Sequence, residues 1–445
     1  MKNKKKYFGT DGIRGKVGNF PIVQSFFFKL AISLAQSKKN VRNILIGKDT
    51  RLSCSQLENA LFNGFDFVNI KTDFIGVVST PILSFYTNFF KYDYGIMISA
   101  SHNPYYDNGI KIFKKNGEKL NDKEEVKIEK ILDSLTVKPR VTKKKKIVNK
   151  VLEFKNYKKE ILEKFSKKKF KVKIVLDCAN GSVSEIAPKF FEEIGCDVIK
   201  YSSAPNGKNI NKNCGAMHPN RISKLTKQSS ADIGLSFDGD ADRVIISDEK
   251  GNILDGDIII AAIAKYHKFK KNYKIKSIVS TYMCNIGFRE FLHKSKIRLY
   301  LTKVGDRYVI QKMKKAKIIL GGEQSGHVIF SDNGYCGDGI LTAMFIINII
   351  SEQKIKLSTL TEKLFVKSSQ KLLNIKTKNN SEEIIKNLEK TNVLQNIKKK
   401  YKDLDCLIRK SGTENLLRIM VQSKNKNEVN KVLSILGNLV NKLDG

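Results

Sequence analysis

The sequence has no tryptophan and is poor in acids and in arginine. Only 44 Asp and Glu stand against 82 Lys and Arg, which gives the 445 residues a formal net charge of +38. Eleven of the basic residues are Arg, so Lys carries most of this charge. Proteins that read bases rely on the paired hydrogen bonds of Arg and on stacking aromatics. Specific nucleic-acid recognition is therefore not expected, and salt-sensitive, non-specific affinity stays open as an alternative.

Paired cysteines and long apolar runs are also missing. The seven Cys are an odd number without a C-x-x-C pair, which argues against a disulfide framework and against a zinc site. The basic N-terminus runs into Gly and Asp where a signal peptide needs apolar residues. The longest apolar runs, Ile258–Ala264 and Ile340–Ile350, are too short to span a membrane. We expect a soluble cytoplasmic protein with reduced thiols and no membrane partner; whether it is a homodimer stays open.

Short β-branched runs alternate with amphipathic stretches along the chain. An apolar share of 41% is enough for several cores, and the length suits about three domains. The pattern predicts helices that include Pro21–Gln36 and strands that include Ala231–Phe237 and Lys317–Leu320. It restarts twice after polar stretches. We therefore predict an α/β protein with three similar mixed α/β domains (1–150, 151–250 and 251–366) and a smaller C-terminal α+β domain (367–445).

A turn of small residues follows the apolar run Tyr94–Ile98. Its sequence, Ser99-Ala100-Ser101-His102-Asn103-Pro104, predicts that Ser101 is exposed at the carboxyl end of a strand, where α/β proteins bind ligands. Ser101 is a candidate nucleophile, with His102 or Lys111 for charge or proton handling. The segment is not G-x-S-x-G, which disfavours a hydrolase elbow. An Asn-Pro turn that caps a helix is the structural alternative.

Three carboxylates follow the apolar run Ile233–Phe237. Asp238, Asp240 and Asp242 repel one another at close range unless a cation lies between them. Small spacers let the backbone curl so that all three point at one place, and oxygen ligands favour Mg²⁺. A calcium-binding EF-hand loop is excluded because its sixth position needs Gly and here is Arg243. A solvated acidic turn is the alternative.

Three further turns combine glycine with polar side chains. Gly321–His327 offers Glu323, Ser325 and His327, which are suited to sugar hydroxyls. Arg409–Glu414, with Arg418 beyond it, is typical of a phosphate cradle, and Gly9–Gly15 presents Arg14. Each is also compatible with a plain exposed turn. No Walker A motif is present, which disfavours nucleoside-triphosphate hydrolysis.

The five segments together suit phosphoryl transfer. A serine carrying a phosphoryl group beside a metal, with a separate cradle for a second phosphate, implies a substrate that is already phosphorylated elsewhere. The simplest reaction that uses all of these parts moves a phosphate between two positions of one sugar.

These segments resemble the α-D-phosphohexomutase superfamily. GTDGIRG, SASHNP, DGDADR and GEQSGH match as they stand, and RKSGTE matches in part, from Gly9 to Arg418. Within the superfamily the chain is similar to the bacterial phosphoglucosamine mutase family, because Gln324 stands where phosphoglucomutases and phosphomannomutases tend to have Met. The segment Val304–Val309 also looks like the glucosamine form of the sugar-specificity loop. The resemblance implies four domains around a central cleft.

The resemblance implies a role for each matching residue. Ser101 would be the phosphoserine and, with Asp238, Asp240 and Asp242, would bind Mg²⁺. Around the transferring group would lie Arg14, His102 and Lys111, with Arg243 beside the metal loop. The sugar and its distal phosphate would be bound by Gly305, Asp306, Glu323, Ser325, His327, Arg409, Ser411, Gly412, Thr413 and Arg418.

The implied reaction converts glucosamine 6-phosphate to glucosamine 1-phosphate through a 1,6-bisphosphate, and supplies UDP-N-acetylglucosamine for the cell wall. Glucose or glucosamine 1,6-bisphosphate would phosphorylate the serine. A phosphoglucomutase or phosphomannomutase is the nearest alternative, and a basic nucleic-acid-binding protein with relic motifs is the alternative from another class. The chain departs from the family at Lys410 and Asn415, where members usually have Pro, so we expect a looser phosphate loop there.

Overall fold

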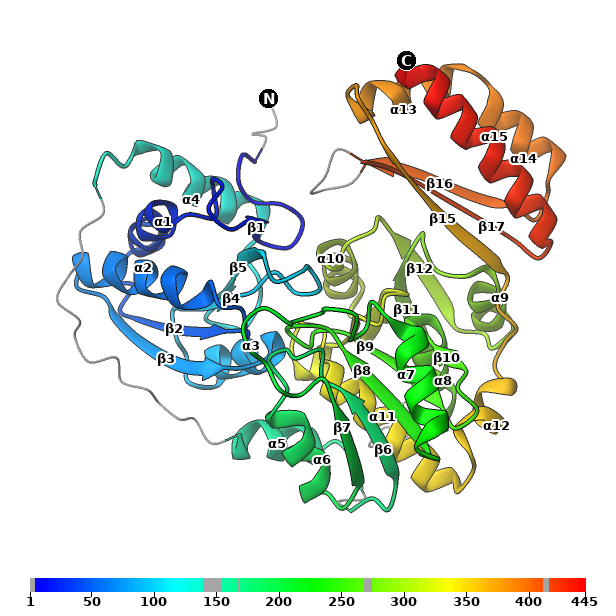
Figure 1. Ribbon diagram of the computed structural model, residues 1–445, viewed down its shortest axis with the longest axis horizontal. Helices are drawn as coiled ribbons and strands as arrows, with labels where there is room; N and C mark the ends of the chain where they lie inside the picture. Colours follow the sequence, from blue (N-terminus) through cyan, green and yellow to red (C-terminus); the bar gives the residue numbers. More distant parts are fainter. Residues whose placement is uncertain (1–4, 139–153, 167–168, 268–273, 411–415) are drawn as a thin grey trace.

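The alternating runs fold into four domains that follow one another along the chain (Figure 1). The structure is a computed structural model and describes residues 5–138, 154–166, 169–267, 274–410 and 416–445. Three α/β domains come first and a smaller α+β domain comes last. The predicted fold class is confirmed.

Domain I is a five-stranded sheet of order β1-β5-β4-β2-β3 with helices on both faces. Its elements are β1 (Ile13–Lys16), α1 (Gln24–Gln36), β2 (Asn43–Lys48), α2 (Cys54–Phe67), β3 (Lys71–Val77), α3 (Thr80–Phe89), β4 (Tyr94–Ile98), β5 (Asp107–Lys114) and α4 (Asp122–Ser134).

Domain II has a five-stranded sheet of order β10-β9-β8-β6-β7. Its elements are α5 (Lys155–Leu162), β6 (Lys173–Asp177), α6 (Ile186–Glu193), β7 (Asp197–Tyr201), α7 (Pro219–Gln228), β8 (Ile233–Phe237), β9 (Val244–Asp248) and β10 (Ile253–Leu254).

Domain III has a four-stranded sheet of order β12-β11-β13-β14. Its elements are α8 (Gly256–Tyr266), β11 (Ser277–Thr281), α9 (Ile286–Lys294), β12 (Arg298–Thr302), α10 (Asp306–Ala316), β13 (Leu320–Gly322), β14 (Val328–Phe330), the 3₁₀ turn η2 (Ser331–Asn333), α11 (Gly339–Gln353) and α12 (Leu357–Glu362).

Domain IV is a three-stranded antiparallel sheet of order β15-β17-β16, with helices packed on one face. Its elements are β15 (Ser369–Lys376), α13 (Ser381–Lys390), α14 (Val393–Lys400), β16 (Asp405–Lys410), β17 (Leu416–Ser423) and α15 (Lys426–Asp444).

The first three sheets repeat one arrangement of strands. Three strands are parallel, and the last of them pairs antiparallel with the strand that follows it: β4 with β5, β8 with β9, and β13 with β14. The connection inside each antiparallel pair is short. These three connections hold Ser101, the three Asp side chains and Glu323, so the repeat puts each sequence motif at the same place in its own domain.

One apolar core runs through domains I, II and III. It extends from Leu45 in domain I through Phe170 in domain II to Phe345 on α11. The other face of the domain I sheet has its own core with α1, α2 and α4, and domain IV has a separate core. The first three domains are therefore joined by apolar packing that domain IV does not share.

Three predicted elements begin later than their sequence pattern suggests. The strand expected from Ala231 begins at Ile233, because the Ala231 amide donates to the Thr226 carbonyl at the end of α7. The helix expected from Pro21 begins at Gln24, because residues 18–22 close on themselves through hydrogen bonds between Gly18, Asn19 and Ile22. The strand expected from Lys317 begins at Leu320, because Lys317 ends α10 in the left-handed conformation. Among the described residues, no helix has the length and apolar character to cross a membrane.

Candidate active site

Ser101 lies in the connection between β4 and β5 and is buried, not exposed as the sequence predicts. Its Oγ donates a hydrogen bond to Asp238 Oδ2 at 2.7 Å, and His102 Nδ1 lies 3.3 Å from Ser101 Oγ. The reason for the burial is that domain II packs onto the turn. A Cβ built on Gly239 would lie 2.5 Å from the Ser101 carbonyl oxygen, so only glycine allows this approach.

Two residues that the sequence interpretation missed hold the backbone of this turn. The Arg51 guanidinium donates to the carbonyl oxygens of Ser101 and Asn103 at 2.9 and 2.8 Å and is paired with Asp49, and the side chains of this ion pair are fully buried. From domain II, the Asn211 amide donates to the same two carbonyls at 2.9 Å. The signal for Arg51 was an Asp-Thr-Arg segment directly after β2; Asn211 has no comparable signal.

The three Asp side chains converge as the sequence predicts. Asp238, Asp240 and Asp242 each offer an oxygen, and these oxygens lie within 4.8 Å of one another. All three residues are buried. Ala241 adopts a left-handed backbone with φ of 52°, which supplies the curl between the second and third carboxylates. The spacing in sequence thus becomes a single acidic cluster.

Domain I supplies two partners to this cluster. Lys111 Nζ lies 2.7 Å from Asp240 Oδ2 and 2.8 Å from Asp242 Oδ2. Thr80, at the N-terminus of α3, donates to Asp240 through both its backbone amide and its hydroxyl. Thr80 was not singled out in the sequence. Both contacts fix the position of Asp240 from across the domain boundary.

The cluster fits a divalent cation. Asp240 Oδ1 is buried and has no hydrogen-bond partner among the described residues. Burial, together with the carboxylates of Asp242 and Asp240, raises the pKa of Asp238 to about 8. A buried carboxylate with so high a pKa binds either a proton or a cation at neutral pH. The donors are all oxygen, which is the set preferred by Mg²⁺.

Cationic side chains surround Ser101. Arg14 pairs with Asp11, and its buried Nε has no hydrogen-bond partner among the described residues. The Arg243 Nε lies 3.8 Å from Asp242 Oδ1. Burial and the positive charges of Arg243 and Arg14 lower the pKa of His102 to about 2. His102 is therefore neutral at physiological pH, and positive charge comes from the arginines and Lys111.

The connection between β13 and β14 (323–327, the sugar loop), which the sequence predicts to bind sugar, faces the same site. Glu323 Oε1 accepts a hydrogen bond from the Gly305 amide at 2.9 Å, which joins the two segments predicted to bind sugar. His327 is buried, with Nδ1 3.5 Å from Asp242 Oδ1. Ser325 is exposed in the same loop. The Asp306 carboxylate lies 2.5 Å from Lys119 Nζ, so a protein cation already binds it.

Domain IV contributes two arginines from neighbouring strands. Arg409 on β16 and Arg418 on β17 are directly opposite each other. Burial and the neighbouring Arg418 charge lower the pKa of Arg409. Like charges in this arrangement are unfavourable unless an anion lies between them. Ser411, Gly412 and Thr413 lie outside the described residues. The Lys410 ammonium is paired with Glu382, so its charge is already balanced.

Gln324, which suggested the subfamily, makes a contact between domains. Its amide donates to Gln370 Oε1 on β15 at 2.7 Å, and the Gln370 amide donates to the Met283 carbonyl at 2.8 Å. Nearby, the Gln422 amide donates to the Cys284 carbonyl at 3.1 Å. The sugar loop and domain IV are therefore joined by neutral amide groups.

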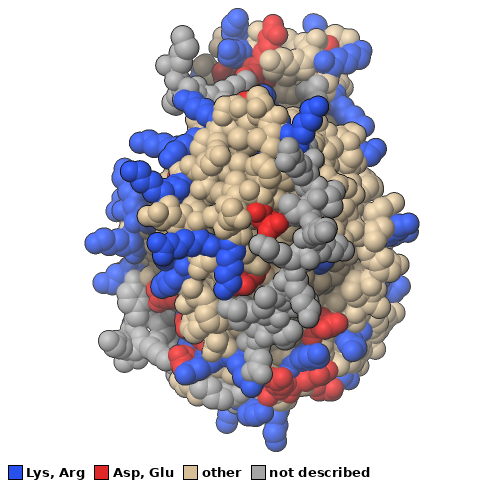
Figure 2. All heavy atoms as spheres, turned by 90° about the vertical axis from the view of Figure 1, so that its left-hand side faces the viewer, with Lys and Arg blue, Asp and Glu red and all other residues tan. Residues whose placement is uncertain are grey.

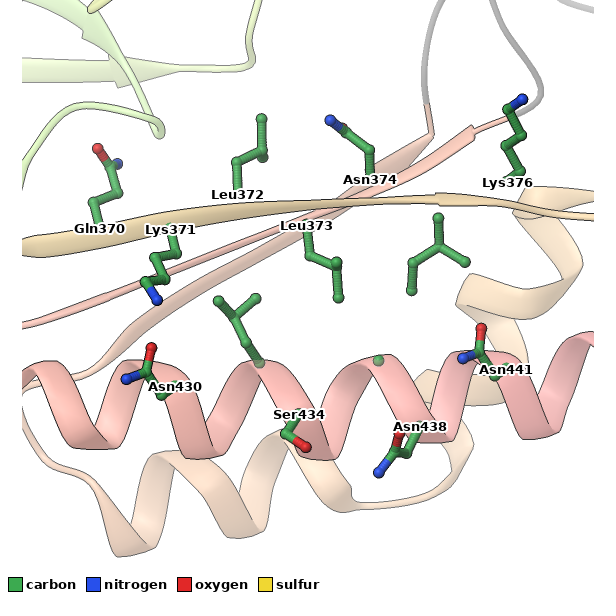
Figure 3. Close-up of a pocket in the computed structure, with 13 residues that line it drawn as sticks. Gln370, Lys371, Leu372, Leu373, Asn374, Lys376, Asn430, Ser434, Asn438 and Asn441 are labelled. Carbon is green, nitrogen blue, oxygen red and sulfur yellow. The ribbon is translucent and has the colours of Figure 1, made fainter.

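A groove of about 930 Å³ in domain IV lies between β15 and α15, and Gln370 is one of the residues that line it (Figure 3). Leu373 points from β15 toward α15, whereas Gln370, Leu372 and Asn374 point the other way (Figure 3). The groove is lined by leucines, asparagines and Lys rather than by clustered acids. It is a gap between an edge strand and its covering helix, separate from the Ser101 site.

On the face at the domain I side, the Lys and Arg side chains are spread out rather than clustered (Figure 2). Figure 2 shows Lys and Arg side chains projecting all round the face on the domain I side, with acidic side chains among them toward the bottom. Solvated lysines spread over this face attract anions across the face rather than at one patch.

The chain matches family models over nearly its whole length. They are described as phosphoglucomutase/phosphomannomutase alpha/beta/alpha domain I at residues 5–138, domain II at 153–251, domain III at 255–368 and the C-terminal domain at 372–435. A phosphoglucosamine mutase of Aliarcobacter butzleri is 41% identical over 443 residues, covering 97% of this chain and 98% of the relative. One of Chlamydia abortus is 39% identical and covers 99% and 97%.

The chain belongs to the phosphoglucosamine mutase family. Solved structures share the fold of this family member over its whole length. A putative phosphomannomutase from Thermus thermophilus has a TM-score of 0.79 at 18% identity, covering 99% of this chain and 100% of that one. Aspergillus fumigatus N-acetylphosphoglucosamine mutase has a TM-score of 0.67 at 16% identity, with glucose 1,6-bisphosphate (100% and 96% covered) and with GlcNAc-6P and magnesium (100% and 97%).

Proposed function

We propose that the chain interconverts glucosamine 6-phosphate and glucosamine 1-phosphate by phosphoryl transfer through Ser101. The observation that carries the proposal is the 2.7 Å contact between Ser101 Oγ and Asp238, which places a hydroxyl nucleophile on a buried cluster of three carboxylates. Full-length relatives that bear the name phosphoglucosamine mutase support the same reaction. The enzyme is an isomerase of the phosphohexomutase class.

In the first half-reaction, the bond between phosphorus and Ser101 Oγ breaks while phosphorus bonds to O1 of glucosamine 6-phosphate. One proton moves from the sugar hydroxyl to Ser101 Oγ. His102 is placed to relay this proton, because its neutral imidazole lies 3.3 Å from that oxygen. Arg14 and Lys111 provide positive charge beside the transferring group. In the second half-reaction the bisphosphate has turned over, and the bond between phosphorus and O6 breaks while phosphorus bonds to Ser101 Oγ. The proton of the Ser101 hydroxyl passes to O6, and glucosamine 1-phosphate leaves.

Asp238, Asp240 and Asp242, together with a phosphoserine oxygen, are the residues that would hold Mg²⁺. When bound, the ion would neutralise charge on the phosphoryl oxygens. Lys111 makes contacts with Asp240 and Asp242 that balance part of the same acidic charge. Arg243 stabilises Asp242 from the other side of the cluster.

The remaining residues hold the parts of the substrate that do not react. Glu323 and Ser325, with His327, bind the sugar hydroxyls, and the turn at Gly305 and Asp306 holds Glu323 in place. The distal phosphate would bind between Arg409 and Arg418, and the sequence motif offers Ser411, Gly412 and Thr413 as further ligands. An anion between these guanidinium groups relieves the repulsion of two opposed cations.

The cellular setting is part of the proposal. Six of the seven cysteines are buried thiols, which suits the reducing cytoplasm. Glucose or glucosamine 1,6-bisphosphate acts as the activator that phosphorylates Ser101. Glucosamine 1-phosphate is the product expected to supply UDP-N-acetylglucosamine for the cell wall.

The test follows the phosphate on the protein. The purified chain is incubated with Mg²⁺ and glucose 1,6-bisphosphate, its intact mass is measured, and the added phosphate is mapped by peptide. Glucosamine, glucose and mannose 6-phosphates are then added separately. We expect one phosphate on Ser101, discharged fastest by glucosamine 6-phosphate with formation of bisphosphate.

Ser101→Ala is the matched variant, because it removes a single side-chain hydrogen bond to Asp238 and leaves the buried backbone contacts of the turn, so the fold should stay intact. It should carry no phosphate and lose turnover by at least about 10³-fold. Discharge by glucose or mannose phosphates alone would assign a sibling activity. Phosphate on another residue, or none, would refute Ser101 as the carrier.

A further inference from the structure

Lys119 lies between two carboxylates that belong to different domains. It stands in the turn between β5 and α4, and its side chain is 14% exposed. Its ammonium group pairs with Asp11 of domain I and, at 2.5 Å, with Asp306 of domain III. The two carboxylates make the cation the more stable form and raise the pKa of Lys119, although burial alone would lower it. A buried ammonium with two carboxylate partners is held firmly in place.

These contacts form part of a closed ring of charged and polar groups. Lys111 Nζ lies 3.2 Å from Asp11 Oδ2, and His327 Nε2 lies 3.9 Å from Asp306 Oδ2. The ring contains Asp242 of domain II, Lys111, Asp11 and Lys119 of domain I, and Asp306 and His327 of domain III. Neighbouring members have opposite charge when His327 is protonated. The ring therefore joins the phosphoserine side of the site to the sugar loop through Lys119.

Lys119 is connected to Glu323 through Asp306 and the neighbouring Gly305. Asp306 is the first residue of α10, and the residue before it, Gly305, donates its amide to Glu323 Oε1 at 2.9 Å. Arg307 follows and pairs with Asp122 and Glu125 of α4. The N-terminus of α10 is thus attached to domain I by charge pairs, and Glu323 is attached to that N-terminus.

We propose that Lys119 is a positioning residue, whose ammonium group fixes Asp306, and with it the Gly305 amide that holds Glu323, at a set place relative to Ser101. The inference deepens the proposed function, because it matters for catalysis only if Glu323 binds the sugar. In this proposal Asp306 does not contact the sugar, because its carboxylate is bound by Lys119. Asp306 instead affects sugar binding indirectly, by fixing the Gly305 amide that holds Glu323.

The first experiment measures the position of the Gly305 segment without substrate. Hydrogen–deuterium exchange of the peptide that contains Gly305 reports whether its amide keeps its acceptor. Lys119→Met should speed this exchange by about tenfold or more, and Lys119→Arg, which keeps the cation, should restore most of the protection. Lys115→Met is the matched control, because Lys115 lies in the same turn, is 58% exposed and is 4.0 Å from its nearest acid.

The second experiment uses protein phosphorylated on Ser101 and titrates its discharge with glucosamine 6-phosphate. Lys119→Met should raise the half-saturating sugar concentration about tenfold and change the limiting rate by less than about threefold, with Mg²⁺ affinity unchanged. Asp306→Asn should have a similar effect, and the double variant should be no worse than either single variant.

Unchanged exchange at Gly305 in Lys119→Met would overturn the inference, as would an equal effect of Lys115→Met or additive effects of the substitutions at 119 and 306. Failure of the proposed function has a different signature: wild-type protein would not discharge to glucosamine 6-phosphate, while the exchange experiment would still show the effect of Lys119 on Gly305.

Discussion

Domain I meets domain II through buried charges, whereas domain IV meets domain III through neutral amides and two partly exposed ion pairs, Arg289 with Asp405 and Lys424 with Glu290. Partly exposed ion pairs contribute little, because water screens them. At the first contact Lys111 touches Asp240 and Asp242. At the second, the Gln370 side chain accepts a hydrogen bond from Gln324 and donates one to the Met283 carbonyl of domain III. The Gln422 amide donates to the next carbonyl, that of Cys284. Separating a buried ion pair leaves uncompensated charge, while a broken amide contact is readily replaced by water. We therefore expect the half of the site proposed to carry out the chemistry to be fixed more strongly than the half proposed to hold the distal phosphate.

The contact between domains II and III is of a third kind. Phe165 of domain II and Phe345 of α11 pack against His267, with ring centroids 5.7 and 4.7 Å from it. Around His267 this contact is apolar, and burial keeps the imidazole neutral by lowering the pKa of His267 to about 4. Elsewhere the two domains also meet through polar pairs such as Tyr157 with Asp338. The three contacts respond to different perturbations, so they can be separated by experiment.

The largest effect is expected from Asp240→Asn, which breaks the charged contact. The variant removes one proposed Mg²⁺ ligand and one partner of Lys111, so Mg²⁺ affinity and turnover should each fall on the order of 100-fold. Titration calorimetry with Mg²⁺ and an activity assay measure the two effects. Asp197→Asn, on the exposed part of β7, is the control. A normal Mg²⁺ titration for Asp240→Asn would mean that the metal binds elsewhere.

Arg51→Met should be the most destabilising change in the support of the Ser101 turn. It leaves Asp49 buried without its cation and removes the donor to the Ser101 and Asn103 carbonyls. The expected loss is about 3–5 kcal/mol of unfolding free energy. Thermal unfolding measures it against Arg42→Met, an exposed arginine of the same domain. Equal midpoints for the two variants would show that the ion pair does not support the turn.

His267 makes the apolar contact sensitive to acid. Because its pKa is lowered in the folded state, the neutral form adds stability above about pH 6.5, and this stability is lost as the pH falls toward 4. The loss should approach about 3 kcal/mol. His267→Phe should flatten the dependence of the unfolding midpoint on pH over this range, and exposed His293→Gln should not. The same slope in wild type and His267→Phe would refute this origin.

The smallest effect is expected at the neutral contact. Gln370→Ala removes the hydrogen bonds to Gln324 and Met283, each with a net value of about 1 kcal/mol. KM for glucosamine 6-phosphate should rise roughly threefold, with kcat and Mg²⁺ affinity unchanged. Steady-state kinetics compare it with Gln228→Ala, an exposed residue of α7. A large fall in kcat would show that domain IV is coupled to the chemistry more strongly than its contacts suggest.

Local sequence patterns predicted elements and motifs where the relevant residues are neighbours in the chain. The three carboxylates converge because Asp238, Asp240 and Asp242 are spaced along one turn, and Ala241 bends that turn. Strand starts were less reliable. Lys317 fits a strand by composition, yet it ends α10, because the end of a helix depends on backbone conformation that composition does not fix.

Burial of Ser101 could not be predicted, because it depends on a different domain. The turn has the composition of an exposed loop, and only the approach of Gly239 and Asn211 covers it. Arg51 and Thr80 were missed because they act on residues 50 and 160 positions away. The Asp-Thr-Arg segment after β2 marks Arg51 as unusual, but it does not say which residues Arg51 contacts.

The sequence by itself determined the residue types, the α/β repeats and the family, because side-chain chemistry and short-range periodicity depend only on residues that are close in the chain. Only the tertiary structure decided which charges meet. Lys119 reaches Asp306 across 187 positions, and Arg409 is opposed to Arg418 by strand register. Such contacts follow from how whole sheets pack, since packing brings distant segments together in ways that no local spacing encodes.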